Sequence, residues 1–300
     1  MSKMNSPTDH PWSFVLLLFF VFLATNLVGS FLASQIWGDI FDQLKEENTI
    51  LEADTRQKLR LGQIVFHLFT FTITSWIVAQ LAYGKDWFRK LGLYGQFDSR
   101  RLLAAIMLLL FVLPTASVLQ YLNVQIDLSE AAAQQEALTN NLLQNVLTGE
   151  TPLEVITLFT AVAILPAIGE ELLFRGLIQG RILPMFIQNQ HAQVIFAGLL
   201  FSIMHMEMAG ILPRWALGIA FGYAFLWTRS LWVPIVMHLL FNGLQAYGVW
   251  SSGEFTADTE VVALPQVVWI AAAVALPASI LLILRQSRAD KTSEDDLPLN

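Results

Sequence analysis

Two adjacent glutamates lie inside a long apolar stretch of the chain. Glu170 and Glu171 belong to the run Val155–Ile187, in which the only other charged residues are Arg175 and Arg181. Successive residues of a helix point about 100° apart, so the two carboxylates must have different partners. Glu171 and Arg175 have the i, i+4 spacing, with glutamate first, that favours an ion pair. We therefore expect Glu170 to lack a local partner, and an unpaired carboxylate within a membrane usually marks function.

Two further polar patterns lie in later apolar runs. Phe201 and His205 are four residues apart, and so are His238 and Asn242. This spacing places each pair on one face of a helix. Counting the helical rise from the charged ends of the runs puts Glu170, His205 and His238 at similar depths. We expect a carboxylate, two imidazoles and an amide to meet there.

Such a set of groups could hydrolyse an amide or ester bond. A carboxylate near a histidine can take a proton from water, as a general base must. A second histidine and an amide can stabilise the negative charge that develops on a carbonyl oxygen. The same groups could instead hold catalytic zinc through Glu170, His205 and His238. The residue types leave both mechanisms open.

Two residues just before the glutamates are expected to shape the helix that carries them. Pro166 removes a backbone donor and should bend the helix. Gly169 lets another backbone come close at this point. By contrast, His67 in an earlier run has no charged partner at motif spacing. We interpret His67 as a hydrogen-bonded packing residue.

The composition is that of a membrane protein. Of the 300 residues, 55% are hydrophobic and 14% are charged, whereas soluble domains carry about 25% charged residues. A helix needs roughly 20 mainly apolar residues to cross a bilayer. Eight runs approach that length: Trp12–Trp37, Leu61–Tyr83, Leu102–Leu122, Val155–Ile187, Ala192–Met208, Ile211–Trp227, Leu231–Trp250 and Gln266–Leu284.

We predict an all-α, polytopic membrane helix bundle of about eight transmembrane helices. Residues 1–300 would form a single membrane domain, with 150–250 as its catalytic core. The expected location is a cell membrane, the plasma membrane of a bacterium. Lys and Arg are dense in the loop 85–101 and absent from the loops 123–150 and 251–265. The positive-inside rule then places both the N- and C-termini in the cytoplasm.

The remaining residues exclude some classes of function and predict one further helix. The chain has no cysteine, which excludes disulfides, thiolate nucleophiles and cysteine metal sites. Its net charge is −7 without a basic stripe, so no nucleic acid is expected as a partner. Asp127 and Glu130 have capping-box spacing before an amphipathic segment. That helix could lie in the membrane interface or pack on the bundle.

Taken together, the three motifs resemble the CAAX prenyl endopeptidase and bacteriocin-processing (CPBP) family. Its pattern is two adjacent glutamates and an arginine after three further residues, then Phe-x-x-x-His, then His-x-x-x-Asn or Asp. This chain has Glu170-Glu171-Leu-Leu-Phe-Arg175 followed by the other two motifs in the same order. The resemblance covers residues 165–243, and no motif position departs from the pattern.

The resemblance implies an intramembrane endopeptidase. Glu170 would activate water with help from His205, while His238 and Asn242 would stabilise the oxyanion. The supporting residues would be Glu171, Arg175 and Phe201. Members have been described both as metalloproteases and as metal-independent glutamate peptidases. We favour the second mechanism, which requires no cofactor, because Asn242 is a poor metal ligand; zinc is the alternative.

The expected partners are membrane lipid and a peptide or protein substrate that is hydrophobic or lipidated, such as a prenylated CAAX-like peptide. One alternative is a non-catalytic membrane protein that binds a peptide or confers bacteriocin immunity. Another is an ion-coupled transporter that uses Glu170 and the histidines as a relay. A transporter of that kind predicts inverted repeats or paired broken helices. The sequence has no internal repeat and one clear break.

Overall fold

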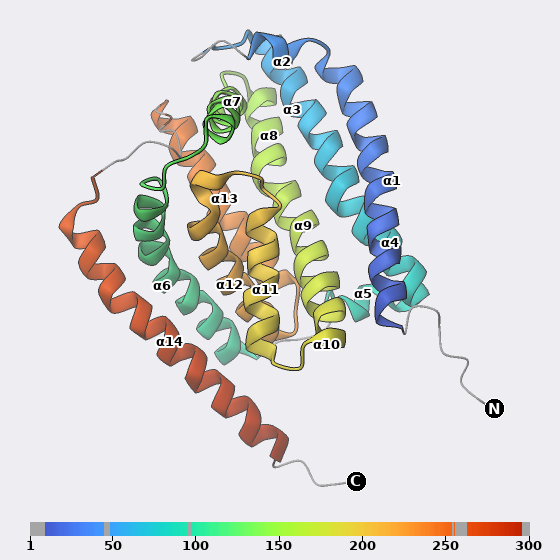
Figure 1. Cartoon of the computed structure of the whole chain (residues 1–300), viewed down its shortest axis with the longest axis vertical. Helices are drawn as coiled ribbons and strands as arrows, with labels where there is room; N and C mark the ends of the chain where they lie inside the picture. The colour runs from blue at the N-terminus through green and yellow to red at the C-terminus, as the bar shows by residue number, and fades with distance from the viewer. Residues whose placement is uncertain (1–9, 45–48, 95–97, 254, 256–262, 296–300) are drawn as a thin grey trace.

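The computed structural model describes residues 10–44, 49–94, 98–253, 255 and 263–295, with side chains described as far as residue 287. Within these residues the chain is helical, with turns and loops and no strand. The long helices stand side by side in one bundle (Figure 1). The predicted all-α fold is confirmed.

Each of the eight apolar runs contains a helix. Six of the runs each contain one helix: α1 (Pro11–Trp37), α6 (Ser99–Asn123), α11 (Gln190–Ile203), α12 (Ile211–Thr228), α13 (Trp232–Ser252) and α14 (Gln266–Asp295). The second run is a continuous helical segment that includes a π-helical part (η): α3 (Ala53–His67), η2 (Leu68–Ile73) and α4 (Thr74–Tyr83). The fourth run is a continuous segment with two π-helical parts: α8 (Pro152–Phe159), η4 (Thr160–Ile164), α9 (Leu165–Glu171), η5 (Leu172–Ile182) and α10 (Leu183–Phe186). The remaining, connecting helices are α2 (Ile40–Gln43), α5 (Trp87–Lys90) and α7 (Glu130–Leu147), together with two 3-10 helices, η3 (Gly84–Asp86) and η6 (Met208–Gly210).

Six helical segments of the described chain are long and apolar enough to cross a membrane, so the protein is a multi-pass membrane protein. The predicted number of about eight is therefore approximate. α11 has 14 residues, which extend about 21 Å against a hydrocarbon core about 30 Å thick. α13 has 21 residues, but His238, Asn242 and Gln245 make it more polar than the other spans.

The first turn of α1 and the last turns of α14 lie at the same end of the bundle (Figure 1). This arrangement fits an even number of crossings. The side of the membrane that this end faces stays a prediction. Lys3 and Lys45, which contribute to the charge pattern behind that prediction, lie outside the described residues.

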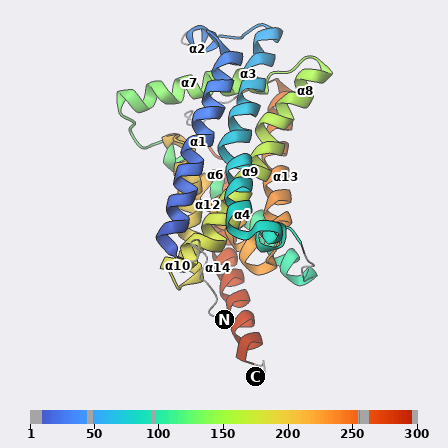
Figure 2. The same cartoon turned by 90° about the vertical axis from the view of Figure 1, so that its right-hand side faces the viewer.

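The helix α7 lies across one end of the long helices (Figure 2). Its side chains bind the bundle: Glu136 Oε1 accepts from the backbone N–H of Ala209 at 2.9 Å, and Asn141 Nδ2 donates to the Leu44 carbonyl at 2.9 Å. These contacts favour packing on the bundle over a place in the membrane interface. The expected capping box at Asp127 is wrong, because the N-cap residue is Ser129.

Buried ion pairs hold α3 against α8. Glu154 Oε1 lies 3.1 Å from Arg56 Nε and 3.1 Å from Arg60 Nη1, and all three residues are buried. Burying charges of both signs without water requires such pairing and hydrogen bonding. Because Arg56, Arg60 and His67 share one face of α3, this anchor also turns His67 toward the helix that carries the glutamates.

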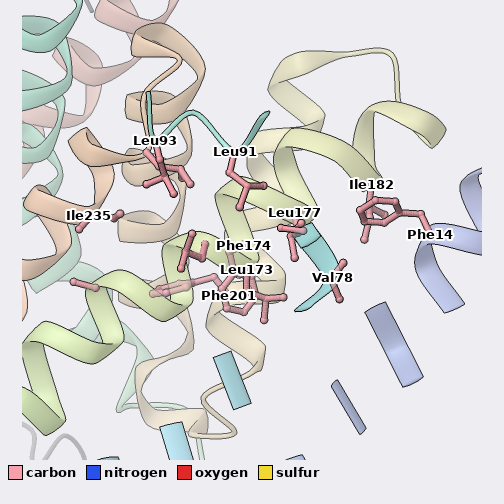
Figure 3. Packing of buried hydrophobic residues seen from close by; sticks show 14 residues of the cluster. Phe14, Val78, Leu91, Leu93, Leu173, Phe174, Leu177, Ile182, Phe201 and Ile235 are labelled. Carbon is pink, nitrogen blue, oxygen red and sulfur yellow. The ribbon is translucent and has the colours of Figure 1, made fainter. Parts of the chain in front are cut away.

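The largest apolar cluster lies beside the polar site. Its members include Phe14 of α1, Val78 of α4, Phe174 of η5, Phe201 of α11 and Ile235 of α13 (Figure 3). Phe201 therefore belongs both to this core and to one of the three motifs. Packing of this kind restricts the side chains around the glutamates to a few arrangements.

Candidate active site

The two glutamates occupy the last two positions of α9 and have separate sets of partners. Glu171 is fully buried, and its Oε1 accepts from Arg175 Nη1 at 2.8 Å, as the i, i+4 spacing predicts. The same oxygen lies 2.9 Å from His238 Nδ1 of α13. Arg175 Nη2 also donates to the Gly218 carbonyl of α12 at 2.9 Å. Glu171 and Arg175 thus connect three helices.

His238 continues this chain of hydrogen bonds to Asn242. A carboxylate paired with arginine only accepts, so Nδ1 of His238 carries the hydrogen and Nε2 is an acceptor. Asn242 Nδ2 lies 3.1 Å from that Nε2 and also donates to the Val162 carbonyl at 3.0 Å. The predicted pair on one face of α13 is present. His238 contacts Glu171, however, where we had expected it to approach Glu170.

Pro166 explains why the Val162 carbonyl is available to Asn242. Val162 lies in the π-helical segment η4, four residues before Pro166. Proline has no N–H to give to the carbonyl four residues earlier. The side-chain amide of Asn242 supplies a hydrogen bond to this carbonyl from another helix. The break that the sequence indicates at Pro166 therefore positions a site residue.

Glu170 has a different environment. It is buried, and its Oε1 lies 3.0 Å from His67 Nε2. Its Oε2 has no hydrogen-bond partner among the described residues and lies 4.0 Å from His205 Nε2. Glu170 thus has no local hydrogen-bond partner among the described residues, as expected, and its partner comes from another helix. The interpretation of His67 as a packing residue was wrong, because His67 contacts this carboxylate.

His205 lies in a turn just beyond α11. The sequence predicted that the fifth run continues as a helix to Met208, but the helix ends at Ile203. The turn includes Met206, whose φ of 55° lies in the left-handed region. His205 Nδ1 donates to the Phe201 carbonyl at 2.9 Å, one of the carbonyls that a helix end leaves without a partner. This bond leaves His205 Nε2 as an acceptor facing Glu170.

Phe201 lies between the two sets of polar groups. Its ring centroid is 5.0 Å from that of His205 and 5.7 Å from that of His238. The guanidinium carbon of Arg175 lies 4.7 Å from the same centroid, within the range of a cation–π contact. All residues predicted for the site are therefore close together. Phe201 packs against members of both sets.

Gly169 permits the approach of η2 that brings His67 to Glu170. A Cβ atom at Gly169 would lie 2.7 Å from Thr72 Oγ1 and 2.9 Å from Phe71 Cβ. The expectation that Gly169 allows a close approach is confirmed. Three π-helical segments, which often mark functional sites, adjoin the site: η2 follows His67, η4 contains Val162 and η5 follows Glu171.

Exposure and charge distinguish the members of the site. Glu171, Arg175 and His238 are almost fully buried, whereas the side chain of His205 is 30% exposed. His205 is therefore the most exposed of the three histidines at the site. With neutral histidines, the two carboxylates and one guanidinium give the site one net negative charge. A proton added to one of the histidines would neutralise this charge.

The side chains do not fit the zinc site considered from the sequence. In the described part of the chain, no three His, Cys, Asp or Glu side chains are arranged to hold a metal ion. Both ring nitrogens of His238 are engaged, by Glu171 and by Asn242.

His67 is the member of this cluster that the motifs did not reveal. Its contact with Glu170 joins residues 103 positions apart. One signal was present: Arg56, Arg60 and His67 recur at helical spacing on one face, just before and within the apolar run that begins at Leu61. Charged residues there require buried acidic partners. The sequence does not indicate which acids these are.

Comparison with known proteins identifies relatives that share this segment. Residues 152–244 match the family model described as type II CAAX prenyl endopeptidase Rce1-like. The chain is similar to the "Membrane-embedded CAAX protease MroQ" of Staphylococcus aureus (strain USA300), with 33% identity over 86 residues, 27% of this chain and 35% of that protein. It is also similar to the "Putative membrane peptidase YdiL" of Bacillus subtilis (strain 168), with 32% identity over 77 residues, 24% of this chain and 29% of that protein.

The aligned segments thus span about a third of the length of these relatives. No solved structure matches the chain significantly. The matched range includes both glutamates, Arg175, His205, His238 and Asn242. His67 lies outside it.

Proposed function

We propose that this chain is an intramembrane endopeptidase, on the basis of the match of residues 152–244 to the Rce1-like CAAX protease family model. It would hydrolyse a peptide bond with a water molecule that Glu170 and His205 activate. Both relatives have names that describe a membrane protease or peptidase. The site itself supplies the residues for each step.

The observation that carries this proposal is the 4.0 Å between Glu170 Oε2 and His205 Nε2. Both atoms are acceptors, because the carboxylate is held by His67 and the Nδ1 hydrogen of His205 goes to the Phe201 carbonyl. Two acceptors at this distance can each take one hydrogen from the same water molecule. The lone pairs of that water oxygen then remain free to attack a carbonyl carbon.

The reaction then follows general-base catalysis. Glu170 Oε2 takes one proton from water as the water oxygen forms a bond to the substrate carbonyl carbon. The carbonyl oxygen becomes an oxyanion. As this intermediate collapses, the carbon–nitrogen bond breaks and the leaving nitrogen takes the proton from Glu170. The products are a carboxyl group and an amine, and Glu170 is again ionised.

Asn242 would stabilise the oxyanion. His238, to which the family resemblance gives the same role, donates from Nδ1 to Glu171 and accepts at Nε2, so it would orient the Asn242 amide instead. An amide group has two N–H hydrogens, and in the structure Asn242 directs them to the Val162 carbonyl and to His238 Nε2. We propose that the oxyanion takes the second hydrogen in place of His238. A donor aimed at developing charge typically contributes about 10²- to 10³-fold to the rate.

The substrate we propose is a short hydrophobic or lipidated peptide. The residues around His205 are apolar and accessible: Ile203, Met204, Met206 and Met208 are exposed. Methionine side chains adapt to apolar partners of different shapes, and exposed apolar patches often mark binding sites. We place both ends of the chain on the cytoplasmic side of the membrane, as the distribution of Lys and Arg predicts.

The experiment that tests this function uses the purified full-length chain in detergent micelles. The probes are two quenched fluorescent peptides of one sequence, each with a cysteine followed by three apolar residues. One carries a farnesyl group on this cysteine and the other does not. Mass spectrometry of the products identifies the cleaved bond. Cleavage of either peptide supports the function, and the absence of cleavage of both overturns it.

A further inference from the structure

His67 contacts the proposed base from a part of the chain outside the segment matched to the family. It ends α3, in the second long helical segment, and its Nε2 lies 3.0 Å from Glu170 Oε1. The side chains of both residues are about nine-tenths buried. No other described side chain donates a hydrogen bond to Glu170. His67 is therefore the group that holds this carboxylate in place.

The chemistry of the two groups fixes the direction of the hydrogen bond. An ionised carboxylate has no hydrogen to give, so Nε2 of His67 must carry one. Nδ1 of His67 is buried and has no hydrogen-bond partner among the described residues. No other group therefore competes for the position of the hydrogen on the ring. The contact with Glu170 sets the tautomer.

This hydrogen bond makes the two oxygens of Glu170 unequal. Oε1 is occupied by His67, whereas Oε2 is left toward His205. A carboxylate held at one oxygen cannot rotate freely about its last bond. The free oxygen is then kept at the position from which it can accept a proton from water, which is what catalytic preorganisation requires.

The packing around His67 keeps it in this position. Its ring lies against Phe71, with centroids 4.5 Å apart. Gly169 leaves the space into which the side chains of η2 fit. At the other end of α3, Glu154 pairs with Arg56 and Arg60. α3 is thus anchored to the glutamate-bearing helical segment at both ends.

We propose that His67 is a positioning residue of the peptidase. It donates a hydrogen bond from Nε2 to Glu170 Oε1, so that Glu170 Oε2 is the oxygen that takes the proton from water. This inference rests on the proposed function. It adds a residue from α3 to a site whose other residues all lie in 152–244.

The kinetic test compares His67→Ala and His67→Gln with the wild-type protein on the farnesylated and unmodified peptides described above. Loss of a hydrogen bond to a charged group should lower kcat about 10- to 100-fold in His67→Ala. KM should stay unchanged, because His67 acts on Glu170 and does not contact the peptide. Glutamine keeps an N–H donor and should restore most of kcat.

His191→Ala is the matched control. His191 is also hydrogen-bonded and partly buried, with Nδ1 2.7 Å from the Tyr223 hydroxyl, but it lies at the start of α11 away from the glutamates. The His191→Ala variant should keep the wild-type kcat. The proposal is overturned if His67→Ala keeps the wild-type kcat while Glu170→Gln is inactive. It is also overturned if the alanine and glutamine variants lose kcat equally while both keep the wild-type Tm.

A second measurement does not depend on activity. The chain has five histidines, and ¹⁵N labelling of histidine reports the protonation of each ring nitrogen by NMR. The signals of His67 are those lost in His67→Gln. We expect Nε2 of His67 to be protonated, and a ring with its hydrogen on Nδ1 alone would overturn the proposal. This measurement tests the hydrogen bond from His67 to Glu170 even if His67→Ala does not fold. It also separates failure of this inference from failure of the proposed function, which the cleavage assay tests.

Discussion

Glu170 Oε2 and His205 Nε2 face each other across 4.0 Å, one from the end of α9 and the other from the turn after α11. Each belongs to a residue whose other polar atom is already bonded, Glu170 to His67 and His205 to the Phe201 carbonyl. The orientation of both groups is therefore fixed before a substrate binds. The second glutamate serves another purpose, since it binds Arg175 and His238.

Replacing Pro166 by alanine should weaken the contact between Asn242 and Val162. Alanine supplies the missing backbone N–H, which then competes with the Asn242 amide for the Val162 carbonyl. We expect kcat to fall about tenfold, which corresponds to one weakened hydrogen bond, while Tm stays the same or rises. Steady-state kinetics and thermal unfolding in detergent measure the two quantities.

The control for this prediction is Pro114→Ala, which removes a proline from the interior of α6. It should raise or maintain stability without changing kcat. A Pro166→Ala variant with wild-type kcat would show that the freed carbonyl does not help to position Asn242.

Replacing Arg175 by alanine should destabilise the protein. Glu171 and Arg175 are both fully buried, and removal of one partner leaves a buried charge without compensation. Breaking such a pair costs about 3–5 kcal/mol. We expect a clear decrease in Tm and in the yield of folded protein, measured by thermal unfolding and size-exclusion chromatography.

The exposed residue Lys85 provides the comparison for Arg175. Lys85→Ala should change the free energy of unfolding by less than about 0.5 kcal/mol. If the two variants unfold at the same temperature, the Glu171–Arg175 pair does not stabilise the junction of α9 with α12 and α13.

Replacing Gly169 by alanine should push η2 away from α9. The added Cβ would lie 2.7 Å from Thr72 Oγ1 and 2.9 Å from Phe71 Cβ. Overpacking of this kind costs about 1–3 kcal/mol, and the shift would separate His67 from Glu170. We expect lower Tm and lower kcat. Gly248→Ala, where nothing lies within 4 Å of the new Cβ, should leave kcat unchanged and should maintain or raise Tm.

Removal of metal ions should leave peptide cleavage unchanged. The proposed reaction proceeds through Glu170 and His205 without a metal, and His238 binds Glu171 and Asn242 through its two ring nitrogens. The measurement is the rate of peptide cleavage after dialysis against a chelator and after addition of zinc. Loss of activity on dialysis, with recovery on addition of zinc, would contradict the proposed mechanism.

The sequence predicts the local features of this site well because they depend on helical periodicity. The Glu171–Arg175 pair follows from i, i+4 spacing, and the close approach at Gly169 follows from the missing side chain. The eight apolar runs likewise locate the helices, although six of the resulting segments are long and apolar enough to span a membrane.

The contacts between helices could not be predicted in the same way. Whether His238 binds Glu170 or Glu171 depends on the rotation and tilt of α13 against α9, which periodicity does not determine. His67 reaches Glu170 across 103 residues of sequence. The end of α11 at Ile203 was also missed, because Met204, Met206 and Met208 follow it and methionine favours the helix.

The rate of peptide cleavage by Glu170→Gln tests the central claim most directly. Glutamine has nearly the same shape as glutamate but cannot take a proton from water. General-base catalysis contributes about 10²- to 10⁴-fold, so we predict a loss of that size with unchanged Tm and unchanged peptide binding. A folded Glu170→Gln variant that cleaves the peptide at the wild-type rate would contradict the claim that Glu170 activates water.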